Sequence, residues 1–402
     1  MLRQGTVRMD DPSRPTVGQL RRIAVVTGSR ADYGLLYWIL RTIQDSQGLE
    51  LDLLVTGTHL SPEFGLTVRD IEADRFPVGA RIEVLLSSDS GVGTAKAMGL
   101  GLLGFTEVLA AHQPDILLVL GDRFETFAAV AAAMPLQIPV AHIHGGEQTH
   151  GVIDELIRHA ITKMSHLHFA AAEAYAARIL QMGEEPWRIV VSGAPGVEAI
   201  QRSPRVPLEE LCARWGLSLE KTSLLVTYHP VTTDREGTDP GIEELLKALE
   251  TVDAEVLFTY PNADSGGRAV LEAIQAFVHS QTNSRLVVNL GQPAYFTLMA
   301  TVSAMVGNSS SGLLEAPSFK LPVVNIGDRQ SGRLRAANVI DVAPTVEDIL
   351  AGVQKALDPA FRRGLAGLCN PYGTGEASRI IVSTLESVPL GATLLRKGFV
   401  TR

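Results

Sequence analysis

Short runs of Val, Ile and Leu alternate with segments of helical periodicity along most of the chain. Several runs are apolar on both faces, which is typical of strands in a buried parallel sheet. In the first half, this pattern predicts strands at 23–27, 51–56, 115–120, 139–143, 166–170 and 188–192, with helices at 32–46, 62–73, 94–112, 124–135, 152–165 and 172–182. The strand–helix alternation indicates a doubly wound α/β layer.

The pattern breaks at residues 201–208, where two prolines stand between polar residues, and we interpret this segment as a hinge. A second series then predicts strands at 223–228, 255–259, 285–289, 302–306 and 322–325, with helices at 240–251, 267–279, 293–300, 312–319 and 346–357. We therefore expect an α/β fold of two Rossmann-like domains that face each other across a cleft. The expected parts are a flexible tail at 1–20, domains at 21–200 and 208–375, and a helix and tail at 376–402 that pack back on the first domain.

Composition narrows the class of protein. The 402 residues are 46% hydrophobic and 20% charged, so large cores can form. The net charge of −9 argues against a nucleic-acid binder, and it means that an anionic substrate must be met by local donors. Two distant cysteines fit a reducing compartment, no apolar run reaches membrane-spanning length, and residues 1–20 lack the apolar core of a signal peptide. We expect a cytoplasmic protein that binds neither nucleic acid nor membrane.

The candidate chemistry falls at the carboxyl ends of predicted strands, where ligands bind in sheets of this kind. Residues 306–315 close one strand and open a helix, and they include Ser309, Ser310 and Ser311. Backbone N–H groups and hydroxyls at such a turn can bind a phosphate or diphosphate, and Glu315 can accept hydrogen bonds from a ribose diol. A serine-rich helix N-cap with a first-turn glutamate is the alternative interpretation.

The first strand ends in the turn at 27–34. Gly28 permits a tight turn there, and Arg30 can form a charge-assisted contact with a phosphate. Asp32 is a further candidate for substrate contact, although it can equally be the N-cap of the following helix. The three-glycine spacing of a dinucleotide site is absent.

Acidic residues follow the next strands. Asp122, beside Arg123, is either a catalytic carboxylate or a salt-bridged N-cap, and the local sequence favours the cap. We also count Arg123 as a candidate substrate contact. Asp154 at the start of a helix suits the helix dipole, and Arg158 can pair with it from one turn later. Asp122, Glu147 and Asp154 would then line one wall of the cleft and divide acid and base roles between them.

Histidines recur at two-residue spacing. His142 and His144, followed by Glu147, would project from one face of a strand, and a metal site is the competing interpretation. Because this series has no cysteine ligand and no HExxH helix, we expect no metal. His166 and His168 lie on a strand after a helix, where a packed, hydrogen-bonded pair is the expected arrangement.

The second half supplies further candidates at strand ends. His229 precedes Pro230, which stops the strand and leaves the histidine facing the cleft as a proton shuttle or phosphate donor. The turn at 260–268 makes Asn262 and Asp264 candidate substrate contacts, and Arg329 lies in a basic segment at 325–333 that could close on the nucleotide.

In series, these segments resemble the hydrolysing UDP-N-acetylglucosamine 2-epimerases of sialic- and legionaminic-acid synthesis. The matching text is Thr-Gly-Ser-Arg-Ala-Asp-Tyr-Gly at 27–34, Gly-Asp-Arg-Phe-Glu at 121–125, His-Ile-His-Gly-Gly-Glu at 142–147, the helix at 153–165, His229-Pro230, Asn-Ser-Ser-Ser-Gly at 308–312 and Asn-Ile-Gly-Asp-Arg-Gln at 325–330. The motifs occur in order from about residue 22 to about residue 342.

The resemblance implies a glycosyltransferase-B type fold whose second domain binds UDP, a homodimer, and no cofactor. It implies that Arg30, Ser309, Ser310 and Glu315 bind the UDP moiety, and that Asp122, Glu147, Asp154 and His229 serve the chemistry. Relatives place a glutamate where His144 stands, so either Glu147 takes that acidic role or His144 acts as the acid or base itself.

The implied reaction converts UDP-N-acetylglucosamine and water to N-acetylmannosamine and UDP. UDP leaves C1 as the C2 proton is removed, and water then adds at C1 while a proton returns to C2 from the opposite face. The same reaction on UDP-N,N'-diacetylbacillosamine is an alternative. A UDP-sugar glycosyltransferase on the same fold is a further one. A non-catalytic sensor is a third, although it would have no need of three carboxylates beside a diphosphate.

Overall fold

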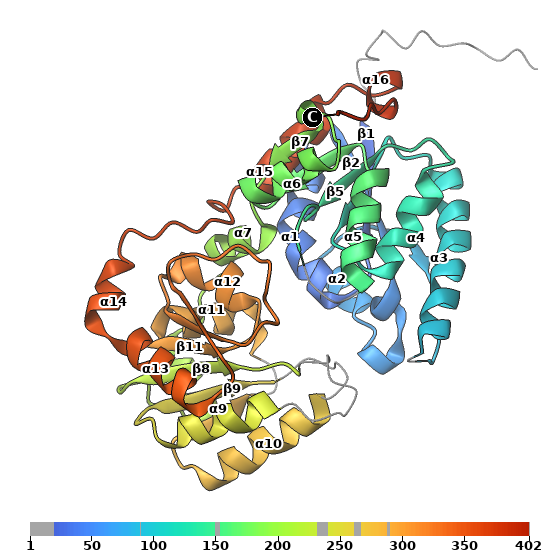
Figure 1. Cartoon of the computed structure of the whole chain (residues 1–402). Helices are drawn as coiled ribbons and strands as arrows, with labels where there is room; N and C mark the ends of the chain where they lie inside the picture. Colours follow the sequence, from blue (N-terminus) through green and yellow to red (C-terminus); the bar gives the residue numbers. More distant parts are fainter. Residues whose placement is uncertain are drawn as a thin grey trace, which may run out of the picture.

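The computed structural model describes residues 20–88, 90–148, 153–230, 240–260, 267–287 and 290–401. They form two α/β layers, which lie one above the other in Figure 1. The first sheet contains β1 (Arg21–Thr27), β2 (Leu49–Thr56), β3 (Val78–Ile82), β4 (Ile116–Leu120), β5 (Val140–Ile143), β6 (Leu167–Ala170) and β7 (Ile189–Val191). Its strands are parallel in the order β3-β2-β1-β4-β5-β6-β7.

Helices cover both faces of the first sheet. They are α1 (Arg30–Asp45), α2 (Val68–Ala73), α3 (Gly91–His112), α4 (Phe124–Ala133), α5 (Ile153–Met164) and α6 (Glu173–Gln181). Along β1, Ile23 and Val25 belong to one buried cluster, and Ala24 and Val26 belong to the cluster on the opposite face. This explains why the strand is apolar at every position, as a doubly covered parallel strand must be.

The second sheet has the parallel order β10-β9-β8-β11-β12-β13. Its strands are β8 (Ser223–Thr227), β9 (Glu255–Thr259), β10 (Ser284–Val287), β11 (Ala304–Gly307), β12 (Val323–Ile326) and β13 (Val339–Val342). Its helices are α9 (Pro240–Glu250), α10 (Gly267–Ser280), α11 (Gly291–Thr301), α12 (Ser311–Leu314), α13 (Val346–Leu357) and α14 (Pro359–Gly364). In each layer the strand order reverses beside the first strand, so the carboxyl ends of β1 and β4, and of β8 and β11, flank a crevice.

Several expected elements differ from the structure. The expected hinge at 201–208 is shorter in the structure, because α7 (Pro195–Arg202) runs to Arg202 and α8 (Leu208–Trp215) begins at Leu208, which leaves a non-helical link at 203–207. The expected helix at 62–73 is a short 3-10 turn at Pro62–Phe64 followed by α2, since Gly65 adopts a left-handed conformation at φ 87°. The expected helix at 312–319 is α12 followed by a 3-10 turn at Ala316–Phe319.

The chain returns from the second layer to the first. α15 (Ala377–Ser387) packs against α1, and its Ile381 and Leu385 join the same buried cluster as Ile23. Figure 1 shows this last part of the chain, in red, running from α14 back to the first layer. Of the expected tail at 1–20, the structure describes only Leu20.

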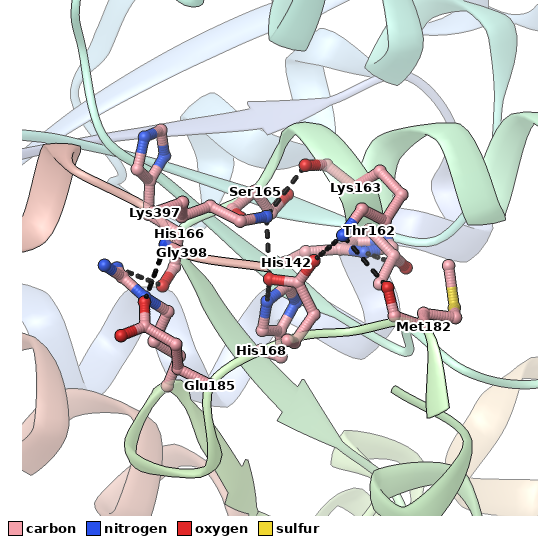
Figure 2. A network of polar contacts seen from close by, with 12 residues as sticks. His142, Thr162, Lys163, Ser165, His166, His168, Met182, Glu185, Lys397 and Gly398 are labelled. Atoms are coloured by element: carbon pink, nitrogen blue, oxygen red, sulfur yellow. Dashed lines mark hydrogen bonds and ion pairs between the residues drawn. The ribbon is translucent and has the colours of Figure 1, made fainter. Parts of the chain in front are cut away.

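A buried ionic network holds the segment after α16 (Ala392–Leu395) against the first sheet (Figure 2). The Nζ of Lys397 lies 2.7 Å from the fully buried carboxylate of Glu184, which also accepts from Lys163 at 2.6 Å and from His168 at 3.0 Å. His166 Nδ1 accepts a hydrogen bond from the Val140 amide. The expected packed, hydrogen-bonded histidines are therefore confirmed, and they lie at the amino ends of the strands. Within the described residues, no helix is both long enough and apolar enough to cross a bilayer.

Candidate functional site

The candidate side chains lie at the carboxyl ends of the central strands of both sheets. Arg30 and Asp32 follow β1, Asp122 follows β4, and His144 follows β5. In the second layer, His229 follows β8, the serine turn follows β11, and Arg329 follows β12. Asn262 and Asp264 lie outside the described residues.

Asp122 is held by an arginine from another helix. Its Oδ2 accepts from Arg158 Nε at 2.9 Å and from Nη2 of the same side chain. Arg158 is almost fully buried and also donates to the Glu147 carbonyl at 3.0 Å and to Glu155 at 2.9 Å. The N-cap of α4 is Arg123, so the cap interpretation of Asp122 is wrong. The Asp122 carboxylate pairs with Arg158 of α5, a residue distant in sequence, and does not cap α4.

The turn after β5 brings His144 and Glu147 together. His144 has a left-handed backbone at φ 67° and Gly146 at φ 77°, and this curl returns the chain so that Nδ1 of His144 donates to the Glu147 carboxylate. A side chain at Gly146 would meet the Tyr175 carbonyl at 2.5 Å, so the curl requires glycine there. The result is a buried carboxylate–imidazole pair at a strand end.

Electrostatics favour the ionised form of Glu147. Burial opposes its ionisation, but the positive field of His144, its hydrogen bond and the charges of Arg333 and Arg158 outweigh burial and lower the Glu147 pKa. The Nε2 of His144 is buried and has no hydrogen-bond partner among the described residues.

His142 does not share this site. Its Nε2 donates to the Gly121 carbonyl at 2.8 Å, and its Nδ1 lies 3.3 Å from the Thr162 hydroxyl. Complete burial lowers its pKa to about 3, so the ring is neutral and belongs to the core. The expectation that His142 and His144 act from one face is wrong, because the left-handed turn redirects His144. In the part of the chain that the structure describes, no three His, Cys, Asp or Glu side chains gather as a metal site would require.

Arg123 and Asp32 belong to a second ionic group. The guanidinium of Arg123 contacts Glu125 at 2.9 Å and Asp32 at 3.9 Å, and it feels the charge of Asp154 at the start of α5. Burial raises the pKa of Asp32, against the opposing field of Arg123. These side chains tie the turn after β1 to the turn after β4.

Asn308 organises the second half of the site. Its side-chain oxygen accepts from the His229 amide at 2.7 Å, and its amide group donates to the His229 carbonyl at 2.8 Å. Gln330 donates to the Asn308 carbonyl at 2.8 Å, and Arg329 does so at 3.3 Å. Burial, with the charge of Arg329, lowers the His229 pKa to about 4, so His229 is neutral at physiological pH.

The serine turn follows β11 and begins α12. Ser310 is the N-cap of α12 and makes no capping hydrogen bond with its side chain, whereas the Ser309 hydroxyl accepts from the Ser311 amide at 3.4 Å. The cap interpretation is therefore met in part, and the Ser310 hydroxyl is the donor that capping leaves unused. Because α12 has only four residues, its dipole is weak, and the donors are hydroxyls and local N–H groups. Across the cleft, Arg30 lies 4.0 Å from Asp70 and lines a cavity of about 450 Å³ together with Gln292 of α11.

Glu315 and Arg333 link the two halves. Burial raises the Glu315 pKa to about 7, and both Arg333 and His144 act on its charge. Arg333 also acts on Glu147, so one arginine influences carboxyls from both layers. Sequence reasoning missed Arg333 as a site residue and chose Arg329 from the same basic segment, because no local feature distinguishes the two arginines.

The two facing sheets define a two-domain α/β protein of the glycosyltransferase-B type, as expected. UDP-GlcNAc 2-epimerase from Neisseria meningitidis bound to UDP-GlcNAc has the same fold, with a TM-score of 0.77 and 22% identity over 90% of this chain and 99% of that one. A family model described as UDP-N-acetylglucosamine 2-epimerase matches residues 41–386. The chain belongs to this family, which confirms the resemblance.

Two relatives are more similar in sequence. UDP-N,N'-diacetylbacillosamine 2-epimerase (hydrolyzing) from Legionella pneumophila is 39% identical over 94% of this chain and 99% of its own. GDP/UDP-N,N'-diacetylbacillosamine 2-epimerase (hydrolyzing) from Campylobacter jejuni is 38% identical over 94% and 99%.

Proposed function

We propose that this protein is a hydrolysing 2-epimerase of a UDP-linked 2-acetamido sugar, and that its substrate is UDP-N,N'-diacetylbacillosamine. The products are then UDP and the free sugar with inverted C2. One observation supports this class of reaction. Asp122 and the His144–Glu147 pair of the first domain converge with the serine turn and Glu315 of the second domain. The two relatives named for this substrate support the choice of sugar.

The chemistry needs an elimination, because the C2 proton is too weakly acidic for simple abstraction. Departure of UDP from C1 requires donors at the diphosphate, which Arg30, Ser309 and Ser310 supply in this proposal. Glu315 accepts from the ribose, and Arg329 with His229 completes the nucleotide side. Preorganised donors of this kind stabilise the leaving charge without reorganisation.

Removal and return of the C2 proton need groups on opposite faces of the sugar. Asp122, Asp154 and the His144–Glu147 pair are the proposed acid and base groups. We assign Asp32 and Arg123 a supporting part, because their ion pairs with each other and with Glu125 fix the turns that carry Arg30 and Asp122. Asn262 and Asp264 stay proposed sugar contacts.

UDP-N-acetylglucosamine is the second candidate substrate, and the description of the matching family favours it. The two sugars differ at C4 and C6, so discrimination depends on whether the cleft accepts a second acetamido group and a methyl. We further propose a cytoplasmic homodimer. Large apolar side chains exposed on α3 and α5, such as Leu103 at 67% and Leu156 at 72%, support an interface on that face.

Product analysis separates the candidates. The protein is incubated with UDP-N,N'-diacetylbacillosamine, its GDP counterpart or UDP-N-acetylglucosamine, without acceptor, and the products are identified by NMR and mass spectrometry. We expect the fastest release of free manno-configured sugar from UDP-N,N'-diacetylbacillosamine. A higher kcat/KM for UDP-N-acetylglucosamine would overturn the substrate assignment, and turnover only with an added acceptor would indicate a glycosyltransferase.

A further inference from the structure

The imidazole of His144 has a ring nitrogen for which the described part of the chain provides no partner. The Nε2 of His144 is buried without a hydrogen-bond partner among the described residues, while Nδ1 of the same ring donates to Glu147. A buried imidazole nitrogen without a hydrogen-bond partner is unfavourable for the fold. The local backbone nevertheless holds the ring there, with a left-handed His144 that L-residues rarely adopt. The arrangement therefore points to a role for Nε2 in contact with a ligand.

We propose that His144 and Glu147 form a catalytic dyad in which Glu147 keeps the proton on Nδ1 and Nε2 removes the proton from C2 of the sugar. In this proposal, which rests on the proposed function, His144 is the catalytic residue and Glu147 is a positioning residue. Glu147 takes no proton itself.

The hydrogen bond decides the tautomer. A carboxylate on Nδ1 fixes the proton there, so the lone pair of the neutral ring is on Nε2, as a base requires. Glu147 is itself fixed by the Arg158 contact to its carbonyl at 3.0 Å and by the tight turn at Gly146. Arg178 of α6 donates to the Gly146 carbonyl and holds the turn from the other side.

The charges around the pair are balanced. The groups that act on His144 or Glu147 are His142 on β5, Arg158 on α5, Tyr175 on α6, Glu315 and Arg333 from the second half, and Tyr372 from the returning chain. Glu147 and Glu315 favour the imidazolium, whereas Arg333 and Arg158 oppose it. When the ring gains a proton during the reaction, the Glu147 carboxylate at Nδ1 is the negative group in direct contact with the new charge.

The C2–H bond breaks and Nε2–H forms, the C2–H electron pair becomes the C1–C2 double bond, and the C1–O bond breaks with its pair leaving on UDP. The imidazolium then releases its proton to solvent. In the second step the C1–C2 electron pair takes a proton at C2 from a protonated carboxyl on the other face, in this proposal Asp122 or Asp154. Water bonds to C1 and loses a proton, which restores that carboxyl.

The test is Glu147→Gln in the full chain, with UDP release measured against pH on whichever UDP-sugar the protein turns over. The Glu147 charge favours the protonated ring, so its loss should move the acid limb of the pH–rate profile to lower pH. The plateau rate of UDP release should fall by about a hundredfold or more, since the tautomer is no longer fixed. Glu147→Asp, which keeps the charge, should restore part of the rate.

A matched control exists at the other end of the first sheet. Asp52 accepts from Nδ1 of His112 at 2.8 Å, the same kind of pair. Asp52→Asn should leave the acid limb and the rate unchanged. The proposal is overturned if Glu147→Gln keeps the wild-type limb, or if it releases UDP at the wild-type rate and accumulates the unsaturated sugar, because the dyad would then act only in hydration.

A second readout does not depend on turnover. NMR of histidine-labelled protein, with His144 assigned through His144→Gln, should show the proton on Nδ1 of His144 in the wild type and a mixture of the two tautomers in Glu147→Gln. A ring protonated at Nε2 would overturn the dyad. If no UDP-sugar is turned over, the proposed function fails while this measurement still decides the pairing.

Discussion

Two carboxyls of the site are in contrasting surroundings. Asp122 receives two N–H donors from the buried guanidinium of Arg158, whereas Oε2 of Glu315 is buried without a partner among the described residues. A carboxylate with charged donors stays available as a base or as a charge, and a carboxyl without them resists ionisation.

Asp122→Asn should fold and lose kcat by about a hundredfold or more, because an amide cannot transfer the proton that the reaction requires. Steady-state kinetics measures the loss of kcat, and a thermal melt checks that the variant folds. Asp253→Asn, an exposed aspartate of the second domain, is the control. Near-normal turnover in the folded variant would mean that Asp122 transfers no proton and only pairs with Arg158.

Glu315→Gln should make stability less dependent on pH. Burial raises the Glu315 pKa from 4.5 to about 7, so between these values the folded protein binds the proton more tightly than the unfolded chain. The contribution of this group to stability is highest below pH 4.5 and is lost as pH rises through 7, by about 3 kcal/mol at most.

Urea unfolding at pH 4.5 and pH 8 measures this effect. At pH 8 the free energy of unfolding of Glu315→Gln should exceed that of the wild type, and at pH 4.5 it should not. The variant should also bind UDP more weakly if Glu315 holds the ribose. An equal difference at both pH values would mean that Glu315 already has a partner when the protein is free of ligand.

At the scale of elements, the sequence predicts the buried central strands of both layers and misses one edge strand of each sheet. β3 and β13 alternate buried and exposed positions and carry Arg81 and Asp341, so neither is the continuous apolar run that identifies a central strand. The motif residues could be predicted because they follow apolar strands directly. The Arg158–Asp122 pair and the influence of Arg333 could not, because contacts between distant segments leave no local pattern.

The turn between β11 and α12 supplies the next prediction. Ser310→Ala and Arg30→Ala should each weaken UDP binding by about 1.5–3 kcal/mol, the range for a hydrogen bond to a charged group. Calorimetry with UDP is the measurement, and Ser387→Ala at the exposed end of α15 is the control. If both variants bind UDP like the wild type, the turn after β11 is not the diphosphate site.

The C-terminal segment should matter for stability and not for binding. Lys397→Ala leaves Glu184 with one cation fewer, and breaking a buried ion pair costs about 3–5 kcal/mol. The Glu184 pKa is lowered to about 2, against burial, by hydrogen bonds from His168, Lys163 and Lys397. This stabilisation is present above pH 4.5 and is lost as pH falls toward 2.

Thermal melts at pH 7 and pH 3 test the segment. Lys397→Ala should lower the melting temperature most at pH 7, with UDP affinity unchanged, because the network lies at the amino ends of the strands. Lys221→Ala, on the exposed surface of the second domain, is the control. A wild-type melting temperature at pH 7 would mean that the segment contributes little to the fold.

At the scale of the whole molecule, the site exists only where the layers meet. A closed ring of hydrogen bonds joins them: the Leu334 amide donates to Tyr175 at 3.1 Å, the two tyrosine hydroxyls lie 3.1 Å apart, and Tyr372 donates to the Leu334 carbonyl at 2.9 Å. The ring fixes the segment that carries Arg333 beside the turn of His144 and Glu147. Neither domain alone contains the proposed machinery.

The central claim is hydrolysis by elimination and hydration with inversion at C2, and isotopic labelling tests it most directly. In deuterated, oxygen-18-labelled water, the released sugar should have manno configuration, one deuterium at C2 and, when sampled early, one heavy oxygen at C1. UDP should carry no heavy oxygen, because the C1–O bond breaks. A gluco product without deuterium would indicate simple hydrolysis, and a manno sugar still joined to UDP would indicate a non-hydrolysing epimerase. Either result would contradict the account.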